Sequence, residues 1–189
     1  MRGAVRSTYS RGAIAFHWSI GVLMILNVLG GFFHESFGKG AVPVIMGLHK
    51  STGILILVLT VGRLVWRLTH RPPPLADSVK RWEKGLAHAT HWTFYLLMFA
   101  LPITGWLMSS AGGRKYPISF YGLFPVPFLP VAQDKAAANI YAERHEMLGF
   151  LVAALIILHL AAALKHHLFD KDNTVIRMLP MLRVRGNGA

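Results

Sequence analysis

Four histidines lie within or at the edge of the longest apolar stretches of the chain: His17, His49, His145 and His159. Ionisable side chains are costly inside a bilayer, and where they occur they are generally functional. His145 and His159 are fourteen residues apart, so in one α-helix their imidazoles share a face and lie about 21 Å apart along the axis. Imidazoles in this setting are the ligands expected for haem iron.

The depth of each histidine in its apolar stretch indicates which ones face each other. His49 and His145 open their stretches on one side of the bilayer, taken here as the outer side, whereas His17 and His159 lie near the inner side. Crossing these pairs would move one ligand by most of a bilayer leaflet. The sequence therefore predicts two pairs of axial ligands, His49 with His145 and His17 with His159. Two imidazoles fill both axial positions of haem iron, an arrangement that suits one-electron transfer.

Other interpretations of these histidines remain open. A single histidine in a membrane helix can serve as an interhelical hydrogen-bond partner. Structural zinc prefers tightly grouped ligands, not ligands spread through about 21 Å of helix. A haem-free small transporter or scaffold is a further alternative, although a transporter is expected to have broken helices and internal pseudo-symmetry. The sequence indicates neither feature.

Four segments are long and apolar enough to form the helices that position these side chains. A helix needs roughly 20 predominantly apolar residues to cross a bilayer core. The segments run from about 13–33, 45–68, 88–110 and 146–165. Pro102 is expected to kink the third segment rather than end it. The whole chain, 1–189, is expected to be a single domain, an all-α four-helix transmembrane bundle.

The composition agrees with a membrane protein. Hydrophobic residues make up 53% of the chain and charged residues only 15%, which is too apolar for an ordinary soluble domain. The net charge of +12 comes from Lys and Arg placed between apolar segments, so nucleic-acid binding is not expected. Cysteine is absent, which excludes disulfides, iron–sulfur clusters and haem attached through cysteine.

The basic residues also predict how the bundle is oriented. Most of them precede the first segment, lie between the second and third, or follow the fourth, and they include Arg2, Arg6, Arg183 and Arg185. By the positive-inside rule both termini face the cytoplasm, assuming a bacterial inner membrane. On the outer side, basic residues such as Arg114 and Lys115 slightly outnumber acidic ones. A positive surface there would steer a small anion such as superoxide or ascorbate.

The connection from Gly112 to Arg144 contains YPISFYGLFPVPFLP, which is too rich in proline and aromatic residues to be helical. It is predicted to form a cap at the outer membrane interface. Glycines allow close approach of a helix or a macrocycle. The candidates are Gly30, Gly31, Gly53, Gly105 and Gly149. Haem propionates need cations, and the candidates are Lys50, Arg63, Arg67 and Arg144.

At these residues the sequence resembles the bacterial cytochrome b561 family, small four-helix di-haem proteins of the inner membrane. The resemblance covers nearly the whole chain and includes FHWSIGVLM, GLHKSTGILIL and GLAHATHWTFYLLMFALPITGW. Its most specific part is RHEMLGFLV followed by LHLAAALKHHLFDKDNTVIRMLP. It implies two haems b, with the family's axial ligands on the four paired histidines. Some members look like superoxide oxidases, which pass electrons from superoxide at the outer face to ubiquinone.

Two further histidines are predicted to lie near the inner pair. His166 is seven residues beyond His159 and so lies on nearly the same helix face, and His91 opens the third segment from the inner side. They could flank a quinone headgroup and relay protons, since histidine titrates near neutral pH. The resemblance implies histidines in this role, and the alternative is that both are merely interfacial. His34, His70 and His167 are interpreted as surface residues.

The function predicted is that of an oxidoreductase that passes electrons from superoxide at the periplasmic face to ubiquinone, with the lipid bilayer as its surroundings. The alternative is a non-catalytic haem-bearing carrier subunit or membrane anchor that links quinone to a partner redox protein. Hydrolytic and transfer chemistry find no support, because the sequence lacks a phosphate-binding glycine-rich loop and a G-x-S-x-G turn.

Overall fold

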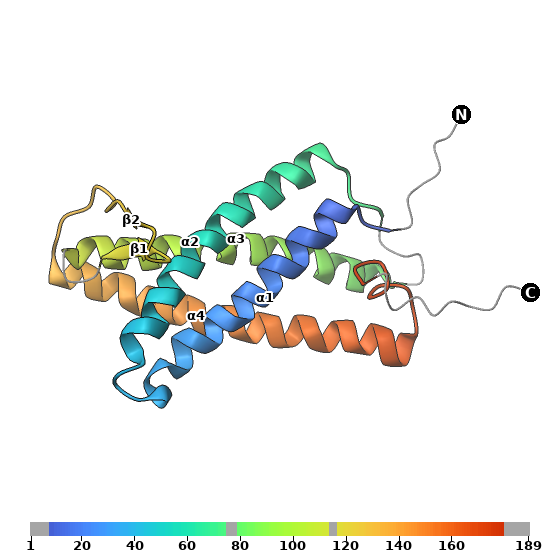
Figure 1. Ribbon diagram of the computed structural model, residues 1–189. Coiled ribbons are helices and arrows are strands. Elements are labelled where there is room, and N and C mark those ends of the chain that lie inside the picture. The colour runs from blue at the N-terminus through green and yellow to red at the C-terminus, as the bar shows by residue number, and fades with distance from the viewer. Residues whose placement is uncertain (1–7, 75–78, 114–116, 180–189) are drawn as a thin grey trace, which may run out of the picture.

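The computed structural model describes residues 8–74, 79–113 and 117–179. These residues form four long helices (Figure 1): α1 (Arg11–Phe33), α2 (Val42–Thr69), α3 (Arg81–Ala111) and α4 (Lys135–Lys165). A short 3₁₀ helix, η1 (His34–Phe37), follows α1, and a π-helical turn, η3 (His166–Asp170), follows α4. Each long helix has the length and apolarity needed to cross a bilayer. The predicted all-α, four-helix transmembrane bundle is confirmed.

In Figure 1 the α1–α2 hairpin crosses the α3–α4 pair obliquely. The name outer end is kept for the end with the α1–α2 and α3–α4 connections, and inner end for the end where α1 begins and α4 ends. Which end faces the cytoplasm stays a prediction. Several basic residues used for that prediction and for the outer positive surface lie outside the described residues: Arg2, Arg6, Arg114, Lys115, Arg183 and Arg185.

α4 begins at Lys135 rather than near 146, so the predicted start of the fourth helix was wrong. Asp134 caps the helix by accepting a hydrogen bond from the Ala137 N–H at 2.9 Å. The first turns of α4, KAAANIYAER, mix alanines with polar and charged residues, so hydropathy does not reveal them. His145 consequently lies inside α4, not at its first turn.

α3 also begins earlier than predicted, at Arg81 rather than near 88. The Glu83 side chain accepts a hydrogen bond from the Lys80 N–H at 3.0 Å and so closes the first turn. At the other end of the helix, α3 continues through Pro102 as far as Ala111. The charged start of α3 brings Glu83 to the inner end, where it takes part in an ionic network.

Residues 117–130, the described part of the proline- and aromatic-rich connection after α3, are not helical, as their composition predicts. They contain a two-stranded hairpin of β1 (Ile118–Phe120) and β2 (Phe124–Val126). The Ser51 hydroxyl of α2 donates to the Ser119 carbonyl at 2.8 Å and accepts from the Tyr121 N–H at 3.0 Å. These bonds hold the hairpin against the outer half of α2.

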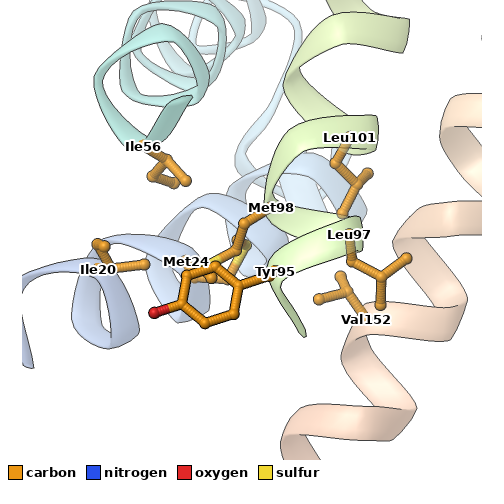
Figure 2. Packing of buried hydrophobic residues seen from close by; sticks show 8 residues of the cluster. All are labelled: Ile20, Met24, Ile56, Tyr95, Leu97, Met98, Leu101 and Val152. Atoms are coloured by element: carbon orange, nitrogen blue, oxygen red, sulfur yellow. The ribbon is translucent and has the colours of Figure 1, made fainter. Parts of the chain in front are cut away.

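Buried side chains from all four helices meet in a central belt, shown in Figure 2. Val152 of α4 is 0% exposed and lies seven residues from both His145 and His159. In Figure 2 Leu97 of α3 approaches Val152, while Tyr95 is directed toward α1. The belt therefore separates the outer histidines from the inner ones. Its members are Ile20, Met24, Ile56, Tyr95, Leu97, Met98, Leu101 and Val152.

Large apolar side chains also point away from the bundle on every long helix. Leu26 is 60% exposed, Val58 61%, Leu96 67% and Leu158 65%. Apolar surface of this extent suits contact with lipid tails rather than with water. Between helices in a bilayer, packing contributes more than removal from water, and the belt supplies such packing between the two helix pairs.

Candidate functional site

His49 of α2 and His145 of α4 face each other in the outer half of the bundle. Their ring centres are 5.9 Å apart and their planes are inclined by 83°. Two imidazoles that bind one metal ion from opposite sides, through bonds of about 2 Å as in zinc sites, hold their ring centres roughly 6 Å apart. The structure thus brings the predicted outer pair to a separation that fits a shared metal ion.

Each outer ring is oriented by the helix that precedes its own. Nδ1 of His49 is 3.0 Å from the Asn27 carbonyl oxygen, and Nδ1 of His145 is 3.0 Å from the Leu101 carbonyl oxygen. A carbonyl can only accept, so Nδ1 carries the proton in both rings and Nε2 keeps its lone pair. This tautomer binds a metal through Nε2, and a carbonyl acceptor is a usual partner for a metal-binding histidine.

A glycine leaves room for each outer ring. A Cβ atom at Gly31 would lie 3.0 Å from Cε1 of His49, and one at Gly105 would lie 3.1 Å from Cε1 of His145. Both separations are tighter than ordinary van der Waals contact, so a side chain at either position would push the ring aside. Thr104 adds a further contact, with its hydroxyl 3.2 Å from Nδ1 of His145.

The other predicted glycines have looser surroundings. A Cβ atom at Gly53 would lie 3.9 Å from the Asn27 side chain, and one at Gly149 would lie 3.8 Å from Phe32. These are ordinary contact distances. Gly53 and Gly149 therefore do not touch a histidine ring, and a role beside the cofactor stays a prediction.

The inner cluster is formed by His17 of α1, His159 of α4 and His91 of α3. The ring centres of His17 and His159 are 6.1 Å apart, and those of His91 and His159 are 6.3 Å apart. Because the two separations are alike, the choice of His17 as the second ligand rests on the predicted depth and on the family resemblance. His91 packs against a predicted ligand.

Two arginines of α2 lie beside the inner cluster. Nη2 of Arg63 is 3.4 Å from Nδ1 of His17, and its guanidinium carbon is 5.5 Å from the Tyr95 ring centre. The Arg67 guanidinium lies 5.8 Å from the Trp92 ring centre. Stacking on aromatic faces holds both cations at the inner end. Within the described residues, neither His17 nor His159 has a hydrogen bond to a backbone carbonyl.

The other two predicted propionate partners lie at the outer end. Lys50 follows His49 and donates to the Pro117 carbonyl at 3.5 Å, close to the hairpin. Arg144 precedes His145 and is exposed. Both residues are neighbours of the outer pair in the chain, and contact with a cofactor stays a prediction.

Ser109 offers an independent test of whether the outer site fits a haem. Its side chain is 1% exposed, and its Oγ has no hydrogen-bond partner among the described residues. Ser109 is four residues beyond Gly105, so it lies on the same face of α3, one turn nearer the outer end. A buried hydroxyl without a partner costs about 1–3 kcal/mol. A haem propionate above the outer pair would supply the missing acceptor.

His166 lies beyond the inner cluster, in an ionic network at the end of α4. Its Nδ1 is 2.8 Å from Asp172 and 3.0 Å from Asp170. The structure thus places His166 between carboxylates, while His91 packs on His159. The sequence stretch HHLFDKD shows these carboxylates near the histidine, but the prediction overlooked them.

Lys165 completes this network. Its Nζ is 2.8 Å from Glu83 and 2.7 Å from Asp170. Glu83, His166 and Asp170 place ligand atoms within 4.8 Å of one another, but the ammonium group of Lys165 lies between the two carboxylates. That ammonium group takes the place a metal cation would need. A cavity of about 180 Å³ lies beside the network.

Asp172 connects the network to the segment that follows it. Partial burial would raise the pKa of Asp172, but hydrogen bonds from Thr174 and His166 outweigh it and lower that pKa below its ordinary value. Further along, the Trp18 indole donates to the Met178 carbonyl at 2.8 Å. The segment after α4 is therefore held against the start of α1, directly next to His17.

Comparisons with known proteins give the family. The model of the prokaryotic cytochrome b561 family matches residues 8–181. The chain is 36% identical over 176 residues to cytochrome b561 homolog 2 of Escherichia coli (strain K12), covering 87% of each protein. It is 36% identical over 179 residues to the probable superoxide oxidase CybB of Yersinia pestis, covering 93% of this chain and 97% of that protein.

Cytochrome b561 homolog 1 of Escherichia coli (strain K12) is 29% identical over 176 residues, covering 91% of this chain and 97% of that protein. The family implies haem b, and the paired imidazoles with protonated Nδ1 at the outer end fit that group. The chain therefore belongs to the prokaryotic cytochrome b561 family and is a multi-pass membrane protein of electron transfer.

Proposed function

We propose that this protein is a di-haem b oxidoreductase of the bacterial inner membrane that passes electrons from superoxide to ubiquinone. The observation that carries the proposal is the pair of facing imidazoles at each end of the bundle, with ring centres 5.9 and 6.1 Å apart. His49 and His145 hold one haem, and His17 and His159 hold the other. Haem, when bound, supplies a group that accepts and releases one electron at a time.

The central belt supports electron transfer between the two sites. Leu97 is 2% exposed and Val152 0%, so these two side chains of the belt are closed off from water. Protons and ions need polar groups or water to move, whereas an electron can pass between cofactors through packed side chains. The belt therefore lets an electron cross the centre of the bundle and holds protons back.

The donor proposed for the outer end is superoxide. The 36% identity with a protein named probable superoxide oxidase supports this choice. Lys50 and Arg144, next to the outer ligands in the chain, provide positive charge that attracts a small anion. Two superoxide ions each lose one electron and become dioxygen, and the two electrons pass to the inner end.

The acceptor proposed for the inner end is ubiquinone. Its reduction to ubiquinol takes two electrons and two protons, and the protons come from the cytoplasm. His166 is partly buried at the inner end with Asp172 at 2.8 Å, and His91 lies in the inner cluster. An imidazole ring can both accept and donate a proton, so His166 and His91 are the proposed proton donors.

A second candidate function is that of a haem-bearing carrier or anchor that exchanges electrons with a partner redox protein. One observation favours it. The tip of the β1–β2 hairpin exposes Leu123 (76%) and Phe124 (54%) at the outer end. An exposed apolar tip of this kind can dock a partner or dip into the membrane interface.

The first experiment is haem quantitation by pyridine haemochrome on the purified protein and on His49→Ala, His159→Ala and His167→Ala. We expect two haems b per chain in the parent protein and one in each of the first two variants. His167→Ala is the matched control, because His167 is exposed at the end of the bundle, and it should keep both haems. A parent protein without haem would overturn the proposal.

The second experiment separates an enzyme from a carrier. The protein is reconstituted in nanodiscs with a soluble ubiquinone analogue and an enzymatic source of superoxide. An enzyme forms one ubiquinol for two superoxide ions, and superoxide dismutase abolishes the reaction. A carrier or anchor binds two haems but shows no such turnover, and that result would favour the second candidate function.

A further inference from the structure

The outer and inner histidine pairs differ in the groups that lie next to their Nδ1 atoms. At the outer pair, the carbonyl oxygens of Asn27 and Leu101 accept hydrogen bonds from the two Nδ1–H groups, each at 3.0 Å. At the inner pair, Nη2 of Arg63 lies 3.4 Å from Nδ1 of His17. Carbonyl oxygens carry partial negative charge, whereas the guanidinium group carries a full positive charge.

These surroundings act in opposite directions on an iron bound to the rings. A carbonyl acceptor at Nδ1 makes the imidazole a stronger electron donor, which favours the more positive, oxidised iron. A cation beside the ligand favours the reduced iron, because reduction removes one positive charge from the site. Both differences therefore give the inner site the higher reduction potential.

Arg63 acts through its charge rather than through its bond to His17. A guanidinium group can only donate, so that bond needs an unprotonated Nδ1. An iron bound at Nε2 leaves the proton on Nδ1 of His17. The Arg63 guanidinium, which can only donate, then no longer forms a hydrogen bond with this ring. The Tyr95 ring, 5.5 Å from the guanidinium carbon, keeps the cation beside the inner cluster without that bond.

We propose that Arg63 directs electron transfer from the outer to the inner site by raising the reduction potential of the inner haem above that of the outer one. This inference rests on the proposed function, because it needs both haems. In the step it favours, one electron leaves the outer site, which is oxidised, and reaches the inner site, which is reduced. No bond forms or breaks, and no proton moves. In this role Arg63 acts on the inner site through its charge and takes no direct part in the transfer.

The test is a spectroelectrochemical titration of the purified protein and its single-site variants. His159→Ala keeps only the outer haem and His49→Ala only the inner one, so each midpoint potential can be assigned. We expect the lower midpoint in His159→Ala. We also expect Arg63→Gln to shift the inner midpoint downward while the outer midpoint stays in place, and Arg63→Lys to restore most of the shift. Arg71→Gln, an exposed arginine just beyond α2, is the matched control and should change neither.

Two results would overturn the inference. One is an outer midpoint equal to or above the inner one in the single-site variants. The other is an Arg63→Gln protein that keeps both haems with unchanged midpoints. If Arg63→Gln loses the inner haem, the inference is tested instead by the inner midpoint of Arg63→Lys and by the order of the two midpoints in the single-site variants. The haem count of the parent protein tests the proposed function separately, since two haems with the wrong order refute only this inference.

Discussion

The outer and inner histidine pairs have nearly the same ring separation, 5.9 and 6.1 Å, but different surroundings. Each outer ring is held by a backbone carbonyl and a glycine of the preceding helix. The inner rings lie among a third imidazole and two guanidinium groups, next to an ionic network. The same pair of facing imidazoles is therefore built twice in one bundle, while the neighbouring groups differ from one pair to the other.

The outer site also shows how one local arrangement is used twice. In α1 the carbonyl of Asn27 precedes Gly31 by four residues, and in α3 the carbonyl of Leu101 precedes Gly105 by four. A carbonyl oxygen in a helix bonds to the N–H four residues later and has a second lone pair free for an imidazole. A glycine at that later position leaves space for the ring, so the two features act together.

The largest expected effect comes from filling the space beside an outer ring. In Gly105→Leu the new side chain collides with His145, and we expect loss of the outer haem with retention of the inner one. Haem quantitation should fall from two per chain to one. Gly47→Ala is the control, because a Cβ atom at Gly47 meets nothing within 4 Å. Two haems with an unchanged spectrum in Gly105→Leu would refute the assigned outer site.

The second-largest effect is expected from ionic strength, which should change the electron-transfer rates at the two ends to different extents. Raising it from about 0.01 to 0.15 M shortens the Debye length from about 30 to 8 Å. We expect the rate of superoxide oxidation at the outer end to fall several-fold, because superoxide is an anion attracted by positive charge. Exchange of electrons with neutral quinol at the inner end should change little. Equal salt dependence of the two stopped-flow rates would contradict the proposed outer attraction.

A smaller effect is expected for Ser109→Ala. Without haem, the variant removes a buried hydroxyl that has no described partner, so the apoprotein should be as stable or slightly more stable. With haem, it loses a hydrogen bond to a carboxylate, worth about 1.5–3 kcal/mol, and the outer haem should dissociate roughly tenfold faster or more. Haem transfer to apomyoglobin measures the rate. A rate equal to that of the parent protein would show that Ser109 does not contact the haem.

The smallest effect is expected at the inner end, for Asp172→Asn. The pKa of Asp172 is lowered in the folded protein, so its contacts stabilise the segment above its ordinary pKa. This contribution is lost as the pH falls through the lowered pKa. Protection against hydrogen exchange over 172–179, taken relative to the intrinsic exchange rate at each pH, should therefore fall in acid in the parent protein and be lower in the variant at neutral pH. Asp134→Asn, at the outer end, is the control and should leave exchange in this segment unchanged. Unchanged exchange in Asp172→Asn would show that the Asp172 contacts do not stabilise the segment.

Much of the architecture could be predicted from local sequence. Apolar length predicted four spans, and the helical rise placed His145 and His159 on one face of α4 at different depths. The starts of α3 and α4 were missed because they depend on side-chain caps. Glu83 and Asp134 each bond a backbone N–H within one turn, in polar stretches that hydropathy does not identify as helical.

The sequence by itself determined which histidines share a depth, because the rise per residue of a helix is constant. Only the tertiary structure decided which groups surround them. The carbonyl of Leu101 reaches His145, Arg63 reaches His17, and His91 packs on His159 because of how the helices rotate and cross. Rotation about a helix axis changes every lateral contact but leaves the depth of each residue unaltered. Apolar periodicity is a weak guide to that rotation when lipid and protein partners are both apolar.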